Sequence, residues 1–404
     1  MPRLRIAILC ESFPPDPCGG IGTSCFNLFS GLKSKGYAVK VFTIANGSST
    51  TDTADIYRTG FPHIIKVLLP LVVAGWIKLQ ERGGLKYQFA DTLLGVLYGL
   101  KLNHAIKKYS PDIIVVPDKG MSNLFIKPPK HCKVVFVSHH NPMRFVDNPL
   151  IGKHSLIDAK LAVMVQQKAL RKVDAVICPS IYMKQMFNDT YLFNSPVAVI
   201  SNIVDAISIG EISPLNLHKN YDLPTNSPIV YIPSAGSLIK GSIFVFEIIR
   251  RLSSDVLRPI GFYLSGNIGL ELTELLKFVP KNAHLIIPGK TTYQENIAYI
   301  KGCNVCVSPT LLESFGMALL EAQICGLPCV SFDVGGNCEV LNNSSSGYLA
   351  PFLDLEGLIL NAVKICSIKF MEIKTEKITK YTYNTDAILN QYVDFFTKLS
   401  TRSD

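Results

Sequence analysis

Residues 305–322 read VCVSPTLLESFGMALLEA, in which a short apolar run is followed by a loop and a helical pattern. The apolar run Val305–Ser308 is typical of a strand that is buried on both faces. A helical pattern follows it, and we expect Ser314 to cap a helix that runs to Cys325. Strand, loop and helix in this order form the repeating unit of parallel α/β sheets.

Two glutamates lie on this unit at positions that predict different roles. Glu313 falls in the loop at the carboxyl end of the strand, where open α/β sheets bind ligands. Glu321 lies about two turns into the helix, where a carboxylate can accept hydrogen bonds from two neighbouring hydroxyls, as on a ribose. We expect the N–H groups near Phe315, Gly316 and Met317 to face the same place and to favour an anion such as a diphosphate.

The same alternation of strand-like and helical segments runs along all 404 residues. It predicts an α/β fold with two parallel sheets in tandem, helices on both faces of each, and a cleft between them. The predicted strands are 6–10, 37–45, 113–117, 133–138, 175–178 and 197–201 in the first half, and 229–233, 260–265, 284–287, 305–308 and 328–332 in the second.

Near residues 205–225 the sequence becomes polar and contains Gly210, Pro214 and Pro224, which predicts the boundary between two domains. We expect a first Rossmann-like domain at 1–205, a second at 206–380, and a helix within 381–404 that returns to the first domain. A chain of 404 residues is longer than most single domains, so two domains are expected.

Composition narrows the class of protein. Apolar residues make up 48% of the chain and charged residues 18%, so a well-packed core is expected, and a net charge of +9 is too modest for a nucleic-acid-binding surface. It suits an enzyme of anionic phosphates or a protein near an anionic membrane. The eleven cysteines are odd in number and fall mostly in apolar runs, which favours a reducing cytoplasm. Cys303 and Cys306 are expected to pack in the core.

The most membrane-like segment is 64–79, IIKVLLPLVVAGWIKL. Its lysines, Lys66 and Lys78, leave too few apolar residues between them to span a bilayer. Two interpretations stay open, an interfacial segment and a buried helix pair. No signal peptide is visible, and we expect a cytoplasmic protein, which on the interfacial interpretation lies peripherally at the cytoplasmic face of the inner membrane.

Three more motifs follow the glutamate pair. In order they are Gly326-Leu327-Pro328-Cys329-Val330, Gly335-Gly336 with Glu339, and Gly347-Tyr348-Leu349. With this surrounding sequence, Glu313 and Glu321 resemble the glutamate–seven residues–glutamate motif of retaining glycosyltransferases of family 4, which have the GT-B fold. The resemblance implies two Rossmann-like domains that face each other across a cleft. It also implies that Glu313 lies against the donor sugar, that Glu321 holds the ribose, and that Ser314 and Gly236 belong to the donor-binding site.

A glycine-rich segment, Gly19-Gly20-Ile21-Gly22, follows the first predicted strand and lets the backbone approach a phosphate. A dinucleotide-binding motif is disfavoured, because Cys25 stands where its third glycine belongs and no acidic residue ends the second strand. By resemblance, Gly20 faces the donor diphosphate and Gly22 the acceptor.

Two adjacent histidines follow the predicted strand 133–138. By resemblance His139 matches the active-site histidine that contacts the donor sugar, while His140, one place further, stays an alternative with an acceptor-side role. Asn141 and Arg144 are expected to touch the acceptor.

The sequence departs from the family at the loop after strand 229–233. The family has a Gly-Arg pair there and then Lys-Gly, and both basic residues neutralise the leaving diphosphate. Here Gly236 is followed by Ser237, and Lys240 alone carries over. Lys290 or Arg144 then supplies the second charge, or the stabilisation of the diphosphate is weaker.

The resemblance predicts a transferase that moves a sugar from a UDP- or GDP-sugar to a glycan or a lipid-linked acceptor. We expect it to act in bacterial surface polysaccharide or lipopolysaccharide synthesis, to retain the anomeric configuration, and to need neither cofactor nor metal. The stretch 50–110 is expected to shape the acceptor side. The alternatives are a sugar-nucleotide 2-epimerase, a non-catalytic GT-B scaffold in a polysaccharide assembly complex, and a nicotinamide dehydrogenase.

Overall fold

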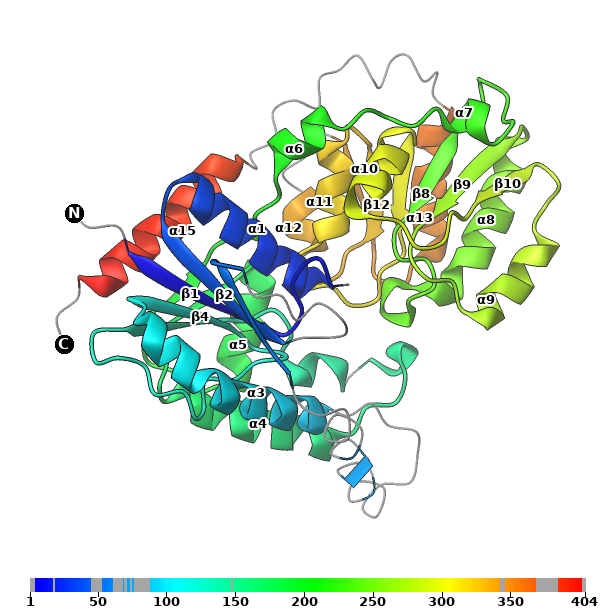
Figure 1. Cartoon of the computed structure of the whole chain (residues 1–404). Coiled ribbons are helices and arrows are strands. Elements are labelled where there is room, and N and C mark those ends of the chain that lie inside the picture. Colours follow the sequence, from blue (N-terminus) through cyan, green and yellow to red (C-terminus); the bar gives the residue numbers. More distant parts are fainter. Residues whose placement is uncertain are drawn as a thin grey trace. The chain divides into compact units, whose positions relative to one another are not determined.

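The structure is a computed structural model that describes residues 4–16, 19–44, 53–60, 88–146, 148–341, 346–367 and 384–401, together with residues 68, 71, 72 and 75. The chain divides into two compact units, which are described one at a time (Figure 1). The N-terminal unit comprises Met1–Ile203 and Thr385–Asp404, and the C-terminal unit comprises Val204–Asn384.

The N-terminal unit is built on a parallel sheet, which in the described residues has seven strands in the order β3-β2-β1-β4-β5-β6-β7. The order reverses between β1 and β4, and ligands of open α/β sheets bind at such a point. The strands are β1 (Arg5–Cys10), β2 (Ala38–Ile44), β3 (Ile56–Thr59), β4 (Ile113–Pro117), β5 (Lys133–Val137), β6 (Ala175–Cys178) and β7 (Val197–Val199).

Helices follow most of these strands, and the last helix of the chain returns to this unit. The helices are α1 (Gly20–Ser34), α3 (Gln88–Tyr109), α4 (Leu156–Leu170), α5 (Ile181–Thr190) and α15 (Thr385–Ser400), with short 3-10 turns η1 (Pro142–Phe145) and η2 (Pro149–Ile151). Helix α15 lies beside α1 (Figure 1).

The C-terminal unit repeats the plan with six described strands, all parallel, in the order β10-β9-β8-β11-β12-β13. The strands are β8 (Ile229–Ile232), β9 (Ile260–Leu264), β10 (Ala283–Ile286), β11 (Val305–Ser308), β12 (Cys329–Phe332) and β13 (Gly347–Ala350). The helices are α6 (Ala206–Glu211), α7 (Leu217–Asn220), α8 (Ser242–Val256), α9 (Leu270–Leu275), α10 (Tyr293–Lys301), α11 (Met317–Ile324), α12 (Asn337–Leu341) and α13 (Leu355–Ser367), with 3-10 turns η3 (Leu238–Lys240) and η4 (Leu276–Phe278).

Both faces of the second sheet are covered. Val230 and Ile232 of β8 point into one apolar cluster, while Ile229 and Tyr231, which alternate with them, point into another. Side chains of a strand alternate between faces, so a strand with a core on each side must be apolar throughout. This is why the continuous apolar runs of the sequence predicted strands correctly.

Every predicted strand is present, with ends that differ by at most two residues. Two strands, β3 and β13, were not predicted. Cys303 and Cys306 are buried, as expected of core residues. Nearly all of the membrane-like segment 64–79 lies outside the described residues. Within the part of the chain that the structure describes, no helix is both long and apolar enough to cross a membrane.

Candidate functional site

In the C-terminal unit, the loops after β8 and β11 meet where the strand order reverses. The Leu311 N–H donates to the Ile239 carbonyl at 2.9 Å. Gly241 has a φ of 82°, and a Cβ at this position would lie 1.9 Å from the Pro309 carbonyl oxygen. The approach of the two loops therefore requires glycine.

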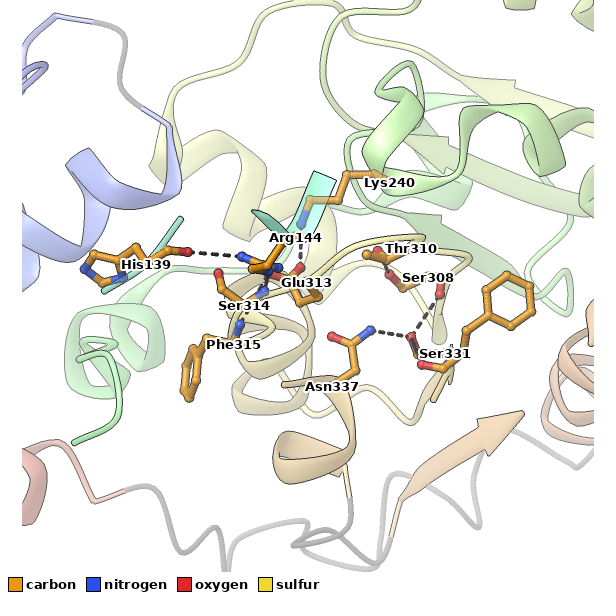
Figure 2. Close-up of polar contacts among 11 residues, drawn as sticks. His139, Arg144, Lys240, Ser308, Thr310, Glu313, Ser314, Phe315, Ser331 and Asn337 are labelled. Atoms are coloured by element: carbon orange, nitrogen blue, oxygen red, sulfur yellow. Dashed lines mark hydrogen bonds and ion pairs between the residues drawn. The ribbon is translucent and has the colours of Figure 1, made fainter. Parts of the chain in front are cut away.

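This approach pairs two of the predicted site residues. Lys240 donates from Nζ to Glu313 Oε2 (Figure 2), and the two side chains are 28% and 13% exposed. The second carboxylate oxygen, Oε1, accepts hydrogen bonds from the N–H groups of Ser314 at 3.0 Å and Phe315 at 3.5 Å. Glu313 thus links the only base carried over from the family pattern to the chain that leads into α11.

The start of α11 corrects two predictions. Ser314 does not cap the helix, because α11 begins at Met317 and its N-cap is Gly316, in the left-handed conformation with φ 103°. The N–H of Phe315 is also not free for an anion, because Glu313 accepts from it. Gly316 and Met317 stand at the N-cap and first helical positions, where an N–H has no acceptor inside its own helix.

A buried network of hydroxyls holds the loop after β11 on the sheet beneath it (Figure 2). Ser308 Oγ and Thr310 Oγ1 are 2.8 Å apart. Ser331 Oγ donates to the Ser308 carbonyl at 3.0 Å and accepts from Asn337 Nδ2 at 2.9 Å. Thr310, Ser331 and Asn337 were not predicted from the sequence, because single polar residues within apolar segments show no characteristic spacing.

Close packing explains why a glycine stands at position 336 of the Gly335-Gly336 motif. A Cβ on Gly336 would lie 2.6 Å from the Phe315 Cα and 2.6 Å from the Ser314 carbonyl oxygen. The start of α12 therefore presses against the chain that precedes α11, and a larger residue would push that chain away.

Glu321 is a buried carboxyl and not a solvated helix residue. It is 8% exposed, and burial raises its pKa to about 7, because water no longer stabilises the charged form. The side chain of Tyr293, the first residue of α10, lowers the pKa of Glu321 and so offsets part of this rise. Near neutral pH this carboxyl therefore exists in both protonation states.

Gly236 has a structural use in the loop after β8. A Cβ there would lie 2.0 Å from the Asn267 carbonyl oxygen, so the loops after β8 and β9 approach closely at this glycine. Ser237, which stands where the family has arginine, is the N-cap of η3. Lys290 is exposed in the same unit, after β10.

In the N-terminal unit, a buried carboxylate organises the turn that carries the histidines. Asp118 follows β4 and is 4% exposed. Its Oδ2 accepts from the N–H groups of His140 at 2.7 Å and Asn141 at 3.1 Å, and from Ser138 Oγ at 3.3 Å. Asp118 was not predicted from the sequence, although an acid directly after a buried strand is a usable signal.

The two histidines differ in their surroundings. Burial lowers the pKa of His139, and the charge of Asp118 only partly offsets this, so its ring is neutral at pH 7. Burial also holds the pKa of His140 well below its usual range. The His140 ring lies 2.7 Å from Gln88 Oε1 and packs on Phe145 at 4.6 Å between ring centroids.

Two residues expected at the acceptor turn inward instead. Asn141 is fully buried, and its Nδ2 donates to the Met186 carbonyl at 3.0 Å and to Thr190 Oγ1 at 2.9 Å. The expectation that Asn141 touches the acceptor is therefore wrong, because its amide is committed to α5.

Arg144 is 8% exposed and donates to the carbonyls of His139 at 3.3 Å and His140 at 3.1 Å (Figure 2). Its guanidinium lies 5.4 Å from the centre of the Tyr182 ring. This arginine holds the histidine turn, and the contacts give it a positioning role in place of the expected acceptor contact.

The glycine-rich segment after β1 opens α1. Gly20 is the first residue of this helix and Gly22 is buried within its first turn. Among the described residues, no atom lies within 4 Å of a Cβ placed on Gly20. Its backbone is therefore accessible to a ligand at the helix start, although no positive φ makes a glycine necessary there.

Models of two protein families match consecutive parts of the chain. The one described as glycosyl transferases group 1 matches residues 216–384, and the one described as glycosyltransferase family 4 matches residues 18–207. Over 181 residues the chain is 28% identical to N-acetyl-alpha-D-glucosaminyl L-malate synthase of Bacillus anthracis. The matched segment makes up 43% of this chain and 45% of that protein.

A second relative is the UDP-Gal:alpha-D-GlcNAc-diphosphoundecaprenol alpha-1,3-galactosyltransferase of Escherichia coli, 29% identical over 102 residues, or 24% of this chain and 26% of that one. Both matches thus span less than half of the relative. The solved sucrose-phosphate synthase of Thermosynechococcus elongatus covers 99% of this chain and 100% of its own, with a TM-score of 0.69 and 18% identity, which shows a shared fold. Two parallel-sheet units, the ordered motifs and the two family models agree, and the chain belongs to the family 4 glycosyltransferases with the GT-B fold.

Proposed function

We propose that this protein transfers a sugar, with retention of anomeric configuration, from a UDP- or GDP-sugar to a glycan or lipid-linked acceptor. The observation that carries the proposal is the Lys240–Glu313 pair, which stands where the strand order of the C-terminal sheet reverses. That place is the expected ligand site of such a sheet. Buried Glu321 on the helix that follows is the group proposed to hold the ribose.

The chemistry needs positive charge and hydrogen-bond donors at one place. Breaking a sugar–phosphate bond develops negative charge on the departing diphosphate, and groups fixed before the reaction stabilise it best. Lys240 and the N–H groups of Gly316 and Met317 are the proposed donors. Glu313, which holds Lys240 and the chain before α11, is the residue proposed to lie against the donor sugar.

His139 is proposed as the catalytic residue of the N-terminal unit. Its ring is neutral at pH 7, so it offers one donor and one acceptor nitrogen to a sugar hydroxyl without adding charge. Asp118 and Arg144 hold the backbone around it. The proposed reaction uses no cofactor and no metal ion, so chelators are expected to leave the rate unchanged.

The acceptor class is proposed from the relatives. The E. coli protein is named for a diphosphoundecaprenol-linked sugar as acceptor, and the B. anthracis protein for malate. We propose the first type, in bacterial surface polysaccharide synthesis at the cytoplasmic membrane face, because the chain carries a net charge of +9 and the membrane-like segment 64–79.

A non-catalytic scaffold is the second candidate, favoured by Ser237 in the place of the family's arginine. A turnover assay separates the two. Purified protein, lipid-linked acceptors and a panel of UDP- and GDP-sugars are incubated with and without EDTA, and release of the nucleoside diphosphate is measured. A transferase releases it with at least one donor, whereas a scaffold binds nucleotide without turnover.

The variant His139→Ala is expected to keep its affinity for the nucleotide and to lose roughly a hundredfold in turnover, the scale of one lost transition-state contact. His131→Ala, at an exposed histidine of the same unit, is the matched control and should keep full activity. Full activity in His139→Ala would move the role to His140 or to neither histidine.

A further inference from the structure

One side of the N-terminal sheet is covered by α3, α4 and the loop after β4, which share an apolar core. Their buried side chains lie in the same cluster as those of β4 and β5. The loop is held on both helices. The Lys127 N–H donates to Asn103 Oδ1 of α3 at 2.9 Å, and Asn123 Nδ2 donates to the Ala169 carbonyl of α4 at 3.1 Å. Because α3 and α4 pack side by side (Figure 1), their outer sides and the loop form one surface.

We name this surface the α3–α4 face. It comprises the exposed side chains of residues 93–108, 124–130 and 156–172. These ranges contain nine lysines and arginines and one aspartate, a net charge of +8, against +9 for the whole chain. The rest of the chain is therefore nearly neutral, and the positive charge is concentrated on this face. All nine basic residues are exposed: Lys101, Lys107, Lys108, Lys127, Lys130, Lys160, Lys168, Arg171 and Lys172.

The one aspartate within these ranges is used inside the fold and does not neutralise the face. Asp158 is fully buried, and its carboxylate accepts from the N–H groups of Gln88 at 2.5 Å and Phe89 at 3.0 Å, so it caps the start of α3. Asp91, just outside the ranges, pairs with Lys119 at 3.7 Å. Residues 93–108, 124–130 and 156–172 thus expose bases and no acid.

Apolar side chains stand between the bases on the same face. Leu156, Lys160 and Met164 recur every four residues and are all exposed, so they lie on the outer side of α4. Leu100 of α3 is 52% exposed and Phe125 of the loop is 50% exposed. A bilayer interface accepts both kinds of side chain, because apolar groups enter the acyl boundary while ammonium groups stay among the headgroups.

We propose that the α3–α4 face binds the surface of a bilayer that contains anionic phospholipids. The inference rests on the part of the proposed function that places this protein at a membrane, and it names the surface that makes the contact. Each lysine near an anionic bilayer strengthens binding about fivefold, so nine exposed bases attract the face strongly. The exposed leucine, methionine and phenylalanine side chains add apolar area that leaves water on contact.

A nucleic acid is the alternative partner for a basic face, and two features disfavour it. Arginine is the residue of choice for phosphate and nucleic-acid recognition, whereas this face has eight lysines and a single arginine, Arg171. Nucleic acids also bind basic surfaces through their phosphates, so exposed apolar side chains contribute little. Removal of Met164 therefore weakens binding to a bilayer and leaves binding to a nucleic acid unchanged.

The test measures cosedimentation of the whole protein with vesicles of phosphatidylcholine and phosphatidylglycerol, and with vesicles of phosphatidylcholine alone. The double variant Lys160→Gln, Lys168→Gln removes two charges from the outer side of α4 with little change in helix propensity. The double variant Lys219→Gln, Lys281→Gln removes two charges from exposed positions of the C-terminal unit and is the matched control. Urea unfolding checks that each variant is as stable as the wild type.

A second pair of variants tests the apolar contribution. Met164→Gln keeps the length of the side chain and makes it polar, and Leu270→Gln, at a leucine of the C-terminal unit that is 87% exposed, is its control. We expect Met164→Gln to bind phosphatidylglycerol vesicles roughly threefold to tenfold more weakly than the wild type, and Leu270→Gln to bind like the wild type. Duplex RNA is the probe for the alternative partner.

We expect the wild type to bind the phosphatidylglycerol vesicles and not those of phosphatidylcholine alone, with binding that weakens as salt rises. The α4 double variant should bind roughly tenfold to thirtyfold more weakly, and the control double variant within about twofold of the wild type. Unchanged binding in the α4 double variant, or equal loss in both, overturns the inference alone.

Two further outcomes also overturn the inference. Tighter binding to duplex RNA than to the vesicles, lost in the α4 double variant and kept in Met164→Gln, assigns the face to a nucleic acid. Failure of the wild type to bind either kind of vesicle removes the membrane placement from the proposed function as well. Sugar transfer itself is then decided separately by the turnover assay, so the two failures are distinguishable.

Discussion

At the scale of the residue, the proposed function of the Glu321 carboxyl opposes the stability of the fold. Glu321 has an ordinary pKa near 4.5, and burial raises it to about 7 in the folded chain. Between these two values the folded protein binds more protons than the unfolded chain, so the free energy of unfolding falls as pH rises through this window. Above this pH window Glu321 is both charged and buried, which costs free energy of unfolding.

Glu321→Gln removes this cost. We expect the variant to gain stability over the wild type as pH rises from about 5 to about 8, by roughly 2 kcal/mol, while its nucleotide affinity falls. Urea unfolding at both pH values measures it. Glu295→Gln is the contrast and should lose stability equally at both pH values, because bonds from Thr292 hold the pKa of Glu295 below its usual range and the carboxyl is ionised throughout this window. A gain in Glu321→Gln that does not depend on pH would contradict the account.

Lys240 tests the phosphate side of the site. Lys240→Met keeps the length of the side chain and removes its charge. We expect affinity for UDP or GDP to fall roughly tenfold to a hundredfold, the scale of a hydrogen bond to a charged group, while affinity for uridine or guanosine stays the same. Calorimetry with the diphosphate and the nucleoside measures both. Lys277→Met, at an exposed ion pair with Glu274, is the control. Equal loss for nucleoside and diphosphate would place Lys240 away from the phosphates.

Two loops form the site at the scale of the element, and a glycine lets them meet. Gly241→Ala forces a Cβ onto a backbone with φ 82° and against the Pro309 carbonyl, 1.9 Å away. Gly326→Ala, with φ 86° and no described atom within 4 Å of the new Cβ, isolates the conformational cost. We expect Gly326→Ala to lose about 1–2 kcal/mol of unfolding free energy and Gly241→Ala to lose more, together with nucleotide affinity. Equal losses in urea unfolding would show that the approach of the loops is not tight.

Strands and helices could be predicted from the sequence where burial alone decides them. β11 and β4 are buried on both faces, so their apolar runs predicted their bounds without error. β13 reads GYLA and β3 reads IYRT, short stretches in which most positions are only partly buried, and neither gives a continuous apolar run. Edge strands need fewer apolar residues because one side faces no neighbour.

Positions that depend on a backbone angle or on a distant partner could not be predicted. The N-cap of α11 was predicted at Ser314, but the structure has it at Gly316. A left-handed glycine N-cap leaves no sequence pattern that a capping rule detects. Asn141 read as an acceptor residue, yet its partners lie on α5, about 45 residues away in sequence.

At the scale of the molecule, the chain builds two sheets of the same design and then returns to the first. Helix α15 packs on α1 in the N-terminal unit, where a Cβ on Gly31 would lie 3.1 Å from a methyl of Leu389. Lys35 and Asp386 add an ion pair at 3.2 Å. The last helix therefore ties the end of the chain to the unit in which it begins.

The proposed function requires this chain to bind a nucleoside diphosphate through its C-terminal unit, and calorimetric titration of UDP and GDP into the whole protein measures that binding. We predict that at least one of them binds with a dissociation constant below about 1 mM, and that Glu321→Ala weakens this binding by about 1–3 kcal/mol. If neither nucleotide binds below that concentration, or if Glu321→Ala binds as tightly as the wild type, the proposed function of the C-terminal unit is contradicted.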